Sequence, residues 1–293
     1  MKIGFIGLGR MGSAMAMRLI GTTGALTVFH PNPAKSARVG AAGAQIATSL
    51  ADLSADREVV ISMLPDDVAL RQVALGAGGL VSELPAGAIH MICGTHGVAA
   101  IREVADGHRE AGQVPVACHV LGRPDLAATG KLGLVCAGPR AAIEKLRPIF
   151  AAIGERLFEA GEDPLAATAI KIANNLVLGC AIEAIGEGMA LVRHYGVDPV
   201  VFHQVLTGGL FNSTAYQAYG DLIAHADWGR VGATAVIGLK DANLALDAAR
   251  AVGTALPSVD VWKAHLQAAI ARGEADLDWS VMAREQFRAS GLE

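Results

Sequence analysis

The chain has 293 residues, of which 52% are hydrophobic and 18% charged, and its formal net charge is -4. This length suits two domains, and the apolar excess predicts a large buried core and a buried subunit interface. The charge shows no basic surplus, which argues against nucleic acid as a partner. No apolar run reaches the roughly 18 residues of a membrane span, and Arg10 interrupts the only N-terminal apolar stretch. Together with four widely spaced cysteines, these features predict a soluble cytoplasmic protein.

The first motif is a glycine-rich turn near the N-terminus. A buried strand is predicted over residues 3–6, followed by Gly7-Leu8-Gly9-Arg10-Met11-Gly12 and by a helix over residues 13–20. Three glycines in this strand–turn–helix context indicate dinucleotide binding. The first glycine permits the tight turn, the second lets the backbone approach a pyrophosphate, and the third lets helix and strand pack closely. The helix N-terminus presents N–H groups to the phosphates.

Short apolar segments then alternate with helical segments through the first half of the chain. This alternation predicts a doubly wound, mostly parallel α/β sheet of the Rossmann type. The predicted strands span residues 2–6, 26–30, 58–63, 88–93, 114–118, 132–137 and 156–159. The predicted helices between them include residues 34–39, 67–75, 98–111 and 140–152.

The pattern changes near Gly161. One long amphipathic helix is predicted from Pro164 to Tyr195, with proline in its first turn and Gly196 just beyond its end. Further helical segments follow at residues 199–206, 233–252, 258–272 and 279–289, without a convincing strand. We therefore predict a dinucleotide-binding Rossmann domain over residues 1–162 and an all-helical substrate and dimerisation domain over residues 163–293.

Two polar residues on the long helix could take part in catalysis. Lys171 and Asn175 are four residues apart, so both project from one face. Next to a nicotinamide, a lysine could protonate a carbonyl oxygen while an asparagine orients it. The spacing alone favours a solvated surface pair, because such pairs are common on helices.

Four motifs occur in the order seen in the β-hydroxyacid dehydrogenases, a family that includes 3-hydroxyisobutyrate dehydrogenases and the tartronate semialdehyde and glyoxylate reductases. The sequence resembles this family over essentially its whole length. The glycine motif is also shared with 6-phosphogluconate dehydrogenases and imine reductases. The motifs are Gly7-Leu8-Gly9-Arg10-Met11-Gly12, Met63-Leu64-Pro65-Asp66, Lys171-Ile172-Ala173-Asn174-Asn175 and Gly238-Leu239-Lys240-Asp241.

The resemblance implies a hydride transfer between a nicotinamide cofactor and a small carbonyl, semialdehyde or β-hydroxyacid. Lys171 matches the family's catalytic lysine, and Asn175 matches its substrate-orienting asparagine. The long helix resembles the interdomain helix around which two subunits interlock. A homodimer or a higher homo-oligomer is therefore expected.

The resemblance also implies contacts with the cofactor. Leu64 and Pro65 match the loop beside the adenosine half, and Thr95 matches the threonine that meets the nicotinamide ribose. Lys240 matches the lysine that closes over the cofactor, supported by Asp241. Leu8, Arg10 and Met11 of the glycine motif complete the expected cofactor contacts. Where the family usually has Ser-Thr before that ribose, this chain has Gly94-Thr95, followed by His96.

The expected substrate loop departs from the family pattern. The usual Ser-Gly-Gly is replaced by Leu121-Gly122-Arg123, which removes a hydroxyl that would bind the substrate carboxylate. The Arg123 guanidinium could grip a carboxylate instead. His119 and Asn174 are the further substrate-binding candidates. For His119, a second proton relay and simple packing are the alternatives.

The end of the second predicted strand bears on the choice of cofactor. NAD-selective enzymes usually place an acid there to bond the ribose 2′-hydroxyl. This chain has His30-Pro31-Asn32-Pro33-Ala34-Lys35 instead, without a carboxylate. The sequence therefore favours NADP, with His30, Asn32 and Lys35 near the 2′-phosphate, and leaves NAD possible.

Other interpretations stay open at this point. Imine reduction on the same scaffold is one alternative, against which Lys171 argues. A cofactor-binding module without turnover is another, against which Lys171 and Asn175 together argue. Cys93, His96, Cys118 and His119 follow two neighbouring strands and could hold zinc. Buried strand cysteines are common, so we expect no metal. Trp228, Trp262 and Trp279 are expected to be packing residues.

Overall fold

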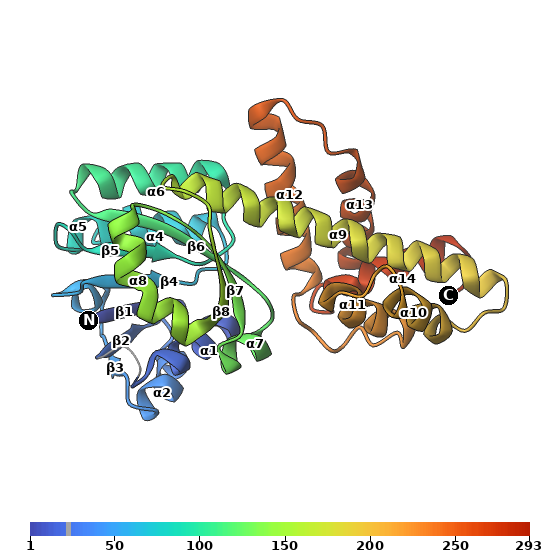
Figure 1. Cartoon of the computed structure of the whole chain (residues 1–293), viewed down its shortest axis with the longest axis horizontal. Helices are drawn as coiled ribbons and strands as arrows, with labels where there is room; N and C mark the ends of the chain where they lie inside the picture. Colours follow the sequence, from blue (N-terminus) through green and yellow to red (C-terminus); the bar gives the residue numbers. More distant parts are fainter. Residues whose placement is uncertain (22–24) are drawn as a thin grey trace. The chain divides into compact units, whose positions relative to one another are not determined.

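The computed structural model describes residues 1–21 and 25–293. A single sheet lies in the first half of the chain, and only helices follow it among the described residues (Figure 1). The strands are β1 (Ile3–Ile6), β2 (Leu26–Phe29), β3 (Gln45–Ile46), β4 (Val59–Ser62), β5 (Ile89–Ile92), β6 (Val114–Leu121), β7 (Leu132–Ala137) and β8 (Gly154–Glu159). The helices of the first half are α1 (Arg10–Leu19), α2 (Pro33–Ala41), α3 (Leu50–Ser54), α4 (Asp67–Leu75), α5 (Leu80–Glu83), α6 (Val98–Glu110), α7 (Pro124–Thr129) and α8 (Arg140–Ile153). The later helices are α9 (Pro164–His194), α10 (Pro199–Gly208), α11 (Thr214–Ala224), α12 (Ala235–Val252), α13 (Pro257–Ala271), the 3₁₀ turn η1 (Trp279–Val281) and α14 (Met282–Ala289).

The sheet has the strand order β3-β2-β1-β4-β5-β6-β7-β8. All neighbouring pairs are parallel except β6 and β7, which are antiparallel. The first six strands have the order typical of a doubly wound dinucleotide-binding fold, in which ligands bind at the carboxyl ends of the strands where the order reverses. The predicted Rossmann-type sheet is confirmed.

Helices cover both faces of this sheet, and each face has its own apolar core. On one face, α1, α7 and α8 pack on the strands through residues such as Met15, Ala127 and Leu146. On the other face, α3, α4, α5 and α6 bury residues such as Leu53 and Leu70. Because both faces are covered, the central strands are apolar runs rather than alternating patterns.

The structure differs from the predicted elements at several segments, most of which are short. β3 was not predicted because both of its residues are exposed and it has no apolar run. Four further helices were not predicted, namely α3, α5, α7 and α11. The predicted helix over residues 279–289 is divided into the 3₁₀ turn η1 and α14. Helix α1 begins at Arg10 rather than at residue 13, so Arg10 and Met11 lie in its first turn.

The chain divides into two compact units, Met1–Lys171 and Ile172–Glu293. Helix α9 starts at Pro164, next to the domain boundary predicted at residues 162/163, yet its first two turns belong to the first unit. Ala167 explains this division, because it is fully buried in an apolar cluster with Ala117 and Val135 of the sheet.

The second unit contains helices and the turn η1. Trp262 and Trp279 are almost completely buried, and their rings meet edge to face with centroids 6.4 Å apart. Trp228 is also buried and lies against Phe287. The three tryptophans are packing residues, as predicted.

A chain of buried polar side chains runs from β4 through β5 to α6 and the segment that follows α6. His90 Nε2 lies 2.8 Å from Ser62 Oγ, and His90 Nδ1 lies 2.7 Å from His108 Nε2. His108 Nδ1 lies 2.6 Å from Gln113 Oε1, and the Gln113 amide nitrogen donates to the carbonyls of Val81 and Leu84. The amide orientation therefore fixes every donor: His108 donates to Gln113, His90 donates to His108, and Ser62 donates to His90. Both rings are neutral in this arrangement.

The buried histidines predict acid sensitivity in the range pH 5–6.5. Burial, as the largest cause, lowers the pKa of His90 and His108, and it lowers that of His119 to about 3. Below about pH 6.5 the unfolded chain therefore binds protons that the native chain does not. For each pH unit by which the pH falls below this value, each such ring lowers the free energy of unfolding by up to about 1.4 kcal/mol. His265 has a raised pKa, owing to Glu183, so its contribution to stability is lost only as the pH rises above 6.5.

Urea unfolding at pH 7.5, 6.5, 5.8 and 5.2 measures this effect. From pH 7.5 to 6.5 the midpoint should rise slightly as His265 gains its proton, and below pH 6.5 it should fall steadily. His108→Gln should reduce the slope, since it removes one of the three rings. A midpoint independent of pH down to 5.2 contradicts the prediction.

Candidate functional site

The glycine turn has the local geometry that close backbone packing requires. Gly7 has φ +93°, and a Cβ at this residue would overlap the carbonyl of Met63. A Cβ on Gly12 would overlap the carbonyl oxygen of Gly7. At Gly9, by contrast, no described atom beyond its chain neighbours lies within 4 Å of the Cβ position. The turn is therefore closed at Gly7 and Gly12 and open at Gly9.

The open position coincides with a helix N-terminus. Gly9 is the N-cap of α1, and no side-chain hydrogen bond from the described residues caps the helix there. The first N–H groups of α1 point out of this end, and a helix N-terminus favours anions. The backbone around Gly9 thus fits a pyrophosphate in shape and in charge.

The loop after β2 is organised by its own polar side chains. His30 Nδ1 accepts a hydrogen bond of 2.9 Å from the backbone N–H of Asn32. The Asn32 side-chain oxygen accepts one of 3.0 Å from Ala34 and so caps α2. Burial, and then the charge of Lys35, lowers the pKa of His30. The loop therefore combines a neutral histidine, an exposed lysine and a helix N-terminus.

The loops after β4 and β5 bring Leu64 and Gly94 together. Leu64 is buried, Pro65 is exposed and Thr95 is half-buried. A Cβ on Gly94 would overlap His96 Nε2 and would lie 2.5 Å from the Leu64 carbonyl oxygen. The imidazole of His96 thus fills the space that a larger side chain at position 94 would need.

His96 is held by the start of α4. Its Nδ1 lies 3.3 Å from Asp67 Oδ1, which also accepts a 2.9 Å hydrogen bond from Gly97. Burial alone would raise the pKa of Asp67, but the hydrogen bonds from His96 and Gly97 lower it overall. Asp67 was not predicted as a site residue, because only the folded chain places α4 beside the end of β5.

His119 connects two segments of the first unit. It lies on β6, is completely buried, and has Nδ1 2.8 Å from the Gly94 carbonyl oxygen and Nε2 2.9 Å from Thr168 Oγ1. Burial, followed by the charges of His96 and Lys171, lowers its pKa to about 3. The ring is therefore neutral near pH 7. Thr168 was also missed, although its position three residues before Lys171 could have drawn attention to it.

Lys171 and Asn175 lie one turn apart on α9, and both side chains are buried. In the second unit, Asn175 Nδ2 donates to Asp241 Oδ2 over 2.7 Å, and Lys240 Nζ lies 3.3 Å from Asp241 Oδ1. Asn174 is exposed, and its Nδ2 lies 3.3 Å from Asn175 Oδ1. One carboxylate thus fixes the Asn175 amide and holds the Lys240 ammonium.

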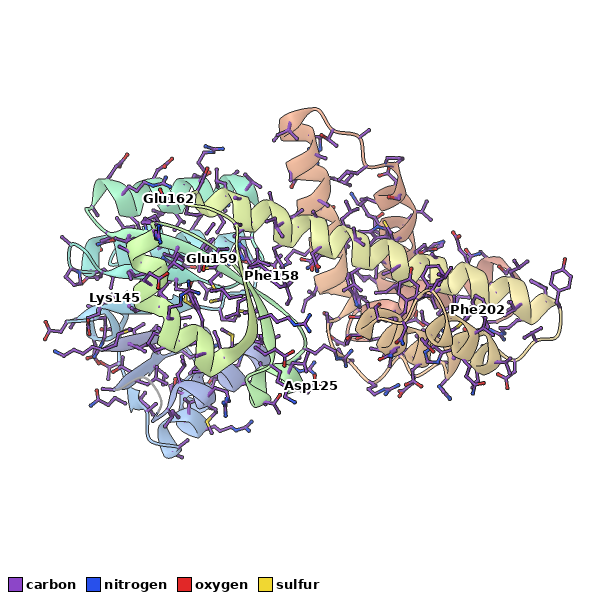
Figure 2. The ribbon with its side chains drawn as sticks, viewed as in Figure 1. Asp125, Lys145, Phe158, Glu159, Glu162 and Phe202 are labelled. Carbon is purple, nitrogen blue, oxygen red and sulfur yellow. The ribbon has the colours of Figure 1, made fainter. Side chains whose placement is uncertain are left out.

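The substrate-loop candidates follow the end of β6. Leu121 is half-buried and packs against the apolar cluster that includes Ala167. Gly122 has φ +139°, which a residue with a side chain rarely adopts. Asp125 lies at the start of α7 (Figure 2), and its Oδ1 is 3.9 Å from Arg123 Nε. The loop therefore turns sharply at Gly122, between an apolar and a cationic side chain.

The described residues contain no group of three or more His, Cys, Asp or Glu side chains that could hold a metal. Cys118 belongs to the core on the α1 side of the sheet, whereas His119, next to it on the strand, bonds to α9. Consecutive strand residues point to opposite faces, so these two could not converge on one ion. Cys118 and His119 therefore do not form part of one shared ligand set in the described structure.

Two family models together match most of the chain. One, described as the NAD binding domain of 6-phosphogluconate dehydrogenase, matches residues 2–161. The other, described as the NAD-binding region of NADP-dependent 3-hydroxyisobutyrate dehydrogenase, matches residues 166–285. The chain belongs to the β-hydroxyacid dehydrogenase family. The predicted resemblance to this family of oxidoreductases is confirmed.

Individual proteins are also similar to the chain over nearly its full length. The uncharacterised oxidoreductase YfjR of Bacillus subtilis is 36% identical and covers 96% of this chain and 98% of its own. The NAD-dependent L-serine dehydrogenase of Pseudomonas aeruginosa is 31% identical, with 96% of each chain covered. The structure of Mycobacterium tuberculosis 3-hydroxyisobutyrate dehydrogenase with L-serine has a TM-score of 0.87 at 26% identity, covering 97% and 98%.

Proposed function

We propose that the chain is an NADP-preferring dehydrogenase or reductase that acts on a small aldehyde, ketone or β-hydroxyacid. The observation that carries the proposal is the buried pair Lys171 and Asn175, one turn apart on α9, in a chain with an open glycine turn. A lysine at this position favours alcohol and carbonyl chemistry over the reduction of imines.

In the proposed reaction, the bound nicotinamide supplies or accepts the hydride. Lys171 donates a proton to the carbonyl oxygen in reduction and accepts it back in oxidation. Asn175 orients the same oxygen, and its amide is fixed for this purpose by Asp241. Gly9 and the N-terminus of α1 hold the pyrophosphate, with Leu64, Pro65 and Thr95 beside the rest of the cofactor.

An oxidation screen tests the proposal directly. Loss of NADPH absorbance is followed with small semialdehydes, keto acids and cyclic imines as substrates. Turnover of carbonyl substrates supports the proposal. Turnover of cyclic imines alone favours the imine reductase alternative, and cofactor binding without turnover of any substrate favours the binding module.

The loop after β2 leads us to expect a higher kcat/KM with NADPH than with NADH. His30→Asp should shift this ratio toward NADH by about tenfold, because like charges about 4 Å apart repel by about 1–4 kcal/mol at a protein surface. Aspartate can also accept the hydrogen bond from Asn32, so the loop should keep its shape. His30→Asn is the matched control without the charge and should change the ratio far less. A clear NADH preference of the unchanged enzyme contradicts the proposal for NADP.

The substrate loop supports a substrate larger than tartronate semialdehyde. Leu121 lacks the hydroxyl of the usual serine, and a carboxylate without full hydrogen bonding is costly to desolvate. A longer acid could instead reach Arg123. Efficient reduction of glyoxylate or tartronate semialdehyde contradicts this inference.

Arg123→Ala tests the role of the guanidinium. We expect a KM about 10- to 100-fold higher for carboxylate substrates, since hydrogen bonds to charged groups contribute about 1.5–3 kcal/mol. KM for a carbonyl substrate without an acid group should be unchanged. Equal KM values for acids in both enzymes would exclude Arg123 as the carboxylate anchor.

We also propose that the enzyme is a cytoplasmic homodimer or a higher homo-oligomer. Helix α9 is the one described helix that is apolar and long enough to cross a membrane by composition and length. Its side chains Ile170, Val177 and Leu191 are 46%, 67% and 61% exposed in the single chain. Lys171 and Glu183 are buried on the same helix, and charged side chains are costly in lipid. We therefore propose that a second copy of the chain, and not a membrane, covers the exposed apolar side chains of α9. The four cysteines are free thiols, which supports a reducing compartment.

A further inference from the structure

His119 is the one completely buried histidine of the described residues that bonds to the helix carrying Lys171. The backbone carbonyl of Gly94 can only accept, so Nδ1 of His119 carries the hydrogen and donates it. In a neutral ring Nε2 is then the acceptor, and the Thr168 hydroxyl donates to it. The same hydroxyl also donates to the Pro164 carbonyl oxygen over 3.1 Å, so its single hydrogen is shared between that carbonyl and the ring.

This arrangement joins three parts of the first unit. Gly94 precedes Thr95 at the end of β5, His119 stands near the end of β6, and Thr168 lies in the second turn of α9. Thr168 and Lys171 are three residues apart and therefore lie on the same side of the helix. These hydrogen bonds fix the rotation of this stretch of α9 about its own axis relative to the carboxyl ends of β5 and β6.

We infer that His119 is a positioning residue that sets the orientation of Lys171 through its hydrogen bond with Thr168. The inference rests on the proposed function, because it takes Lys171 as the proton donor. His119 itself does not transfer the proton. It is fully buried, both ring nitrogens are engaged, and its low pKa keeps the ring neutral near pH 7.

Thr168→Val tests the inference, because valine has the shape of threonine without the hydroxyl. We expect kcat to fall by about 10- to 100-fold, the scale that a misplacement of about 1 Å can produce. The dissociation constant of the cofactor should stay within about twofold. Thr168→Ser restores the donor and should recover most of the lost kcat.

Thr207→Val is the matched control. Thr207 also bonds to the carbonyl four residues earlier, His203, on helix α10, but it has no bond to a histidine ring among the described contacts. We expect this variant to keep the kcat of the unchanged enzyme. His119→Asn is a second test variant, since its amide can still donate to Gly94 but is too short to reach Thr168. It should show the same loss of kcat as Thr168→Val.

If the inference is right, the loss of kcat in Thr168→Val depends on the presence of Lys171. In a Lys171→Ala background, Thr168→Val should lower kcat by less than about twofold further, because coupled residues are not additive. A normal kcat in folded Thr168→Val and His119→Asn overturns the inference, as does an equal loss in both backgrounds. A normal kcat in Lys171→Ala alone refutes the proposed function instead.

The ring itself gives a readout that is independent of activity. The ¹⁵N chemical shifts of His119 should report hydrogen on Nδ1 alone, without titration between pH 5 and 8. Thr168→Val should shift the Nε2 signal and leave Nδ1 nearly unchanged. A ring that titrates in this range, or that carries hydrogen on Nε2, overturns the inference even if Lys171 is catalytic.

Discussion

Replacing Lys171 with alanine should lower kcat by about 10²–10⁴-fold, which is the usual contribution of a general acid or base. This loss corresponds to about 3–5 kcal/mol of transition-state stabilisation. The affinity for the cofactor should be nearly unchanged, because the glycine turn and the end of α1 do not include this lysine. Steady-state kinetics and a fluorescence titration with NADPH measure the two quantities.

Lys145→Ala is the matched control for the loss of a lysine. Lys145 lies on α8 (Figure 2). It forms an exposed ion pair of 3.2 Å with Glu58. Exposed pairs contribute little to stability, so this variant should keep the kcat and the melting temperature of the unchanged enzyme. If Lys171→Ala retains normal kcat with a normal pH profile, another group supplies the proton.

The sequence predicted the parts of the fold that depend on local patterns. The buried parallel strands are apolar runs between helical segments, and α9 has a proline at its start and a glycine after its end, so their patterns are strong. β3 and the short helices α3, α5 and α7 have too few residues to show a period. Their positions depend on packing against the sheet rather than on their own sequence.

In the candidate site, too, the sequence predicted the residues of linear motifs but not the contacts between distant segments. The glycine turn, Lys171 and Asn175 belong to linear motifs. The bonds of His119 to Gly94 and Thr168, and of His96 to Asp67, join residues that are 25, 49 and 29 positions apart. No linear pattern brings such pairs together, so the sequence identified His119 and His96 but not their partners. His96 now gives a physical reason for glycine at position 94, since the two compete for one space.

Substitutions at Gly9 and Gly12 should separate cofactor binding from folding. Gly12→Ala places a methyl group on the Gly7 carbonyl, so α1 must move away from β1. We expect a destabilisation of about 2–4 kcal/mol, from overpacking against backbone that cannot yield. In a chain of this size the melting temperature should fall by about 5–15 °C. Cofactor binding should weaken as well, because the turn is displaced.

Gly9→Ala should weaken cofactor binding and leave the stability of the fold nearly unchanged. Its φ of -73° and ψ of -169° suit any residue, and its Cβ position meets no described atom within 4 Å beyond its chain neighbours. The melting temperature without cofactor should therefore change little. The dissociation constant for NADPH should rise by about tenfold or more, equal to about 1.4 kcal/mol, because the methyl group occupies the space proposed for the pyrophosphate. Calorimetric scans with and without NADPH measure both effects in one experiment. Normal NADPH affinity in Gly9→Ala would show that the pyrophosphate does not approach the backbone at Gly9, and would remove the geometric basis for placing the cofactor there.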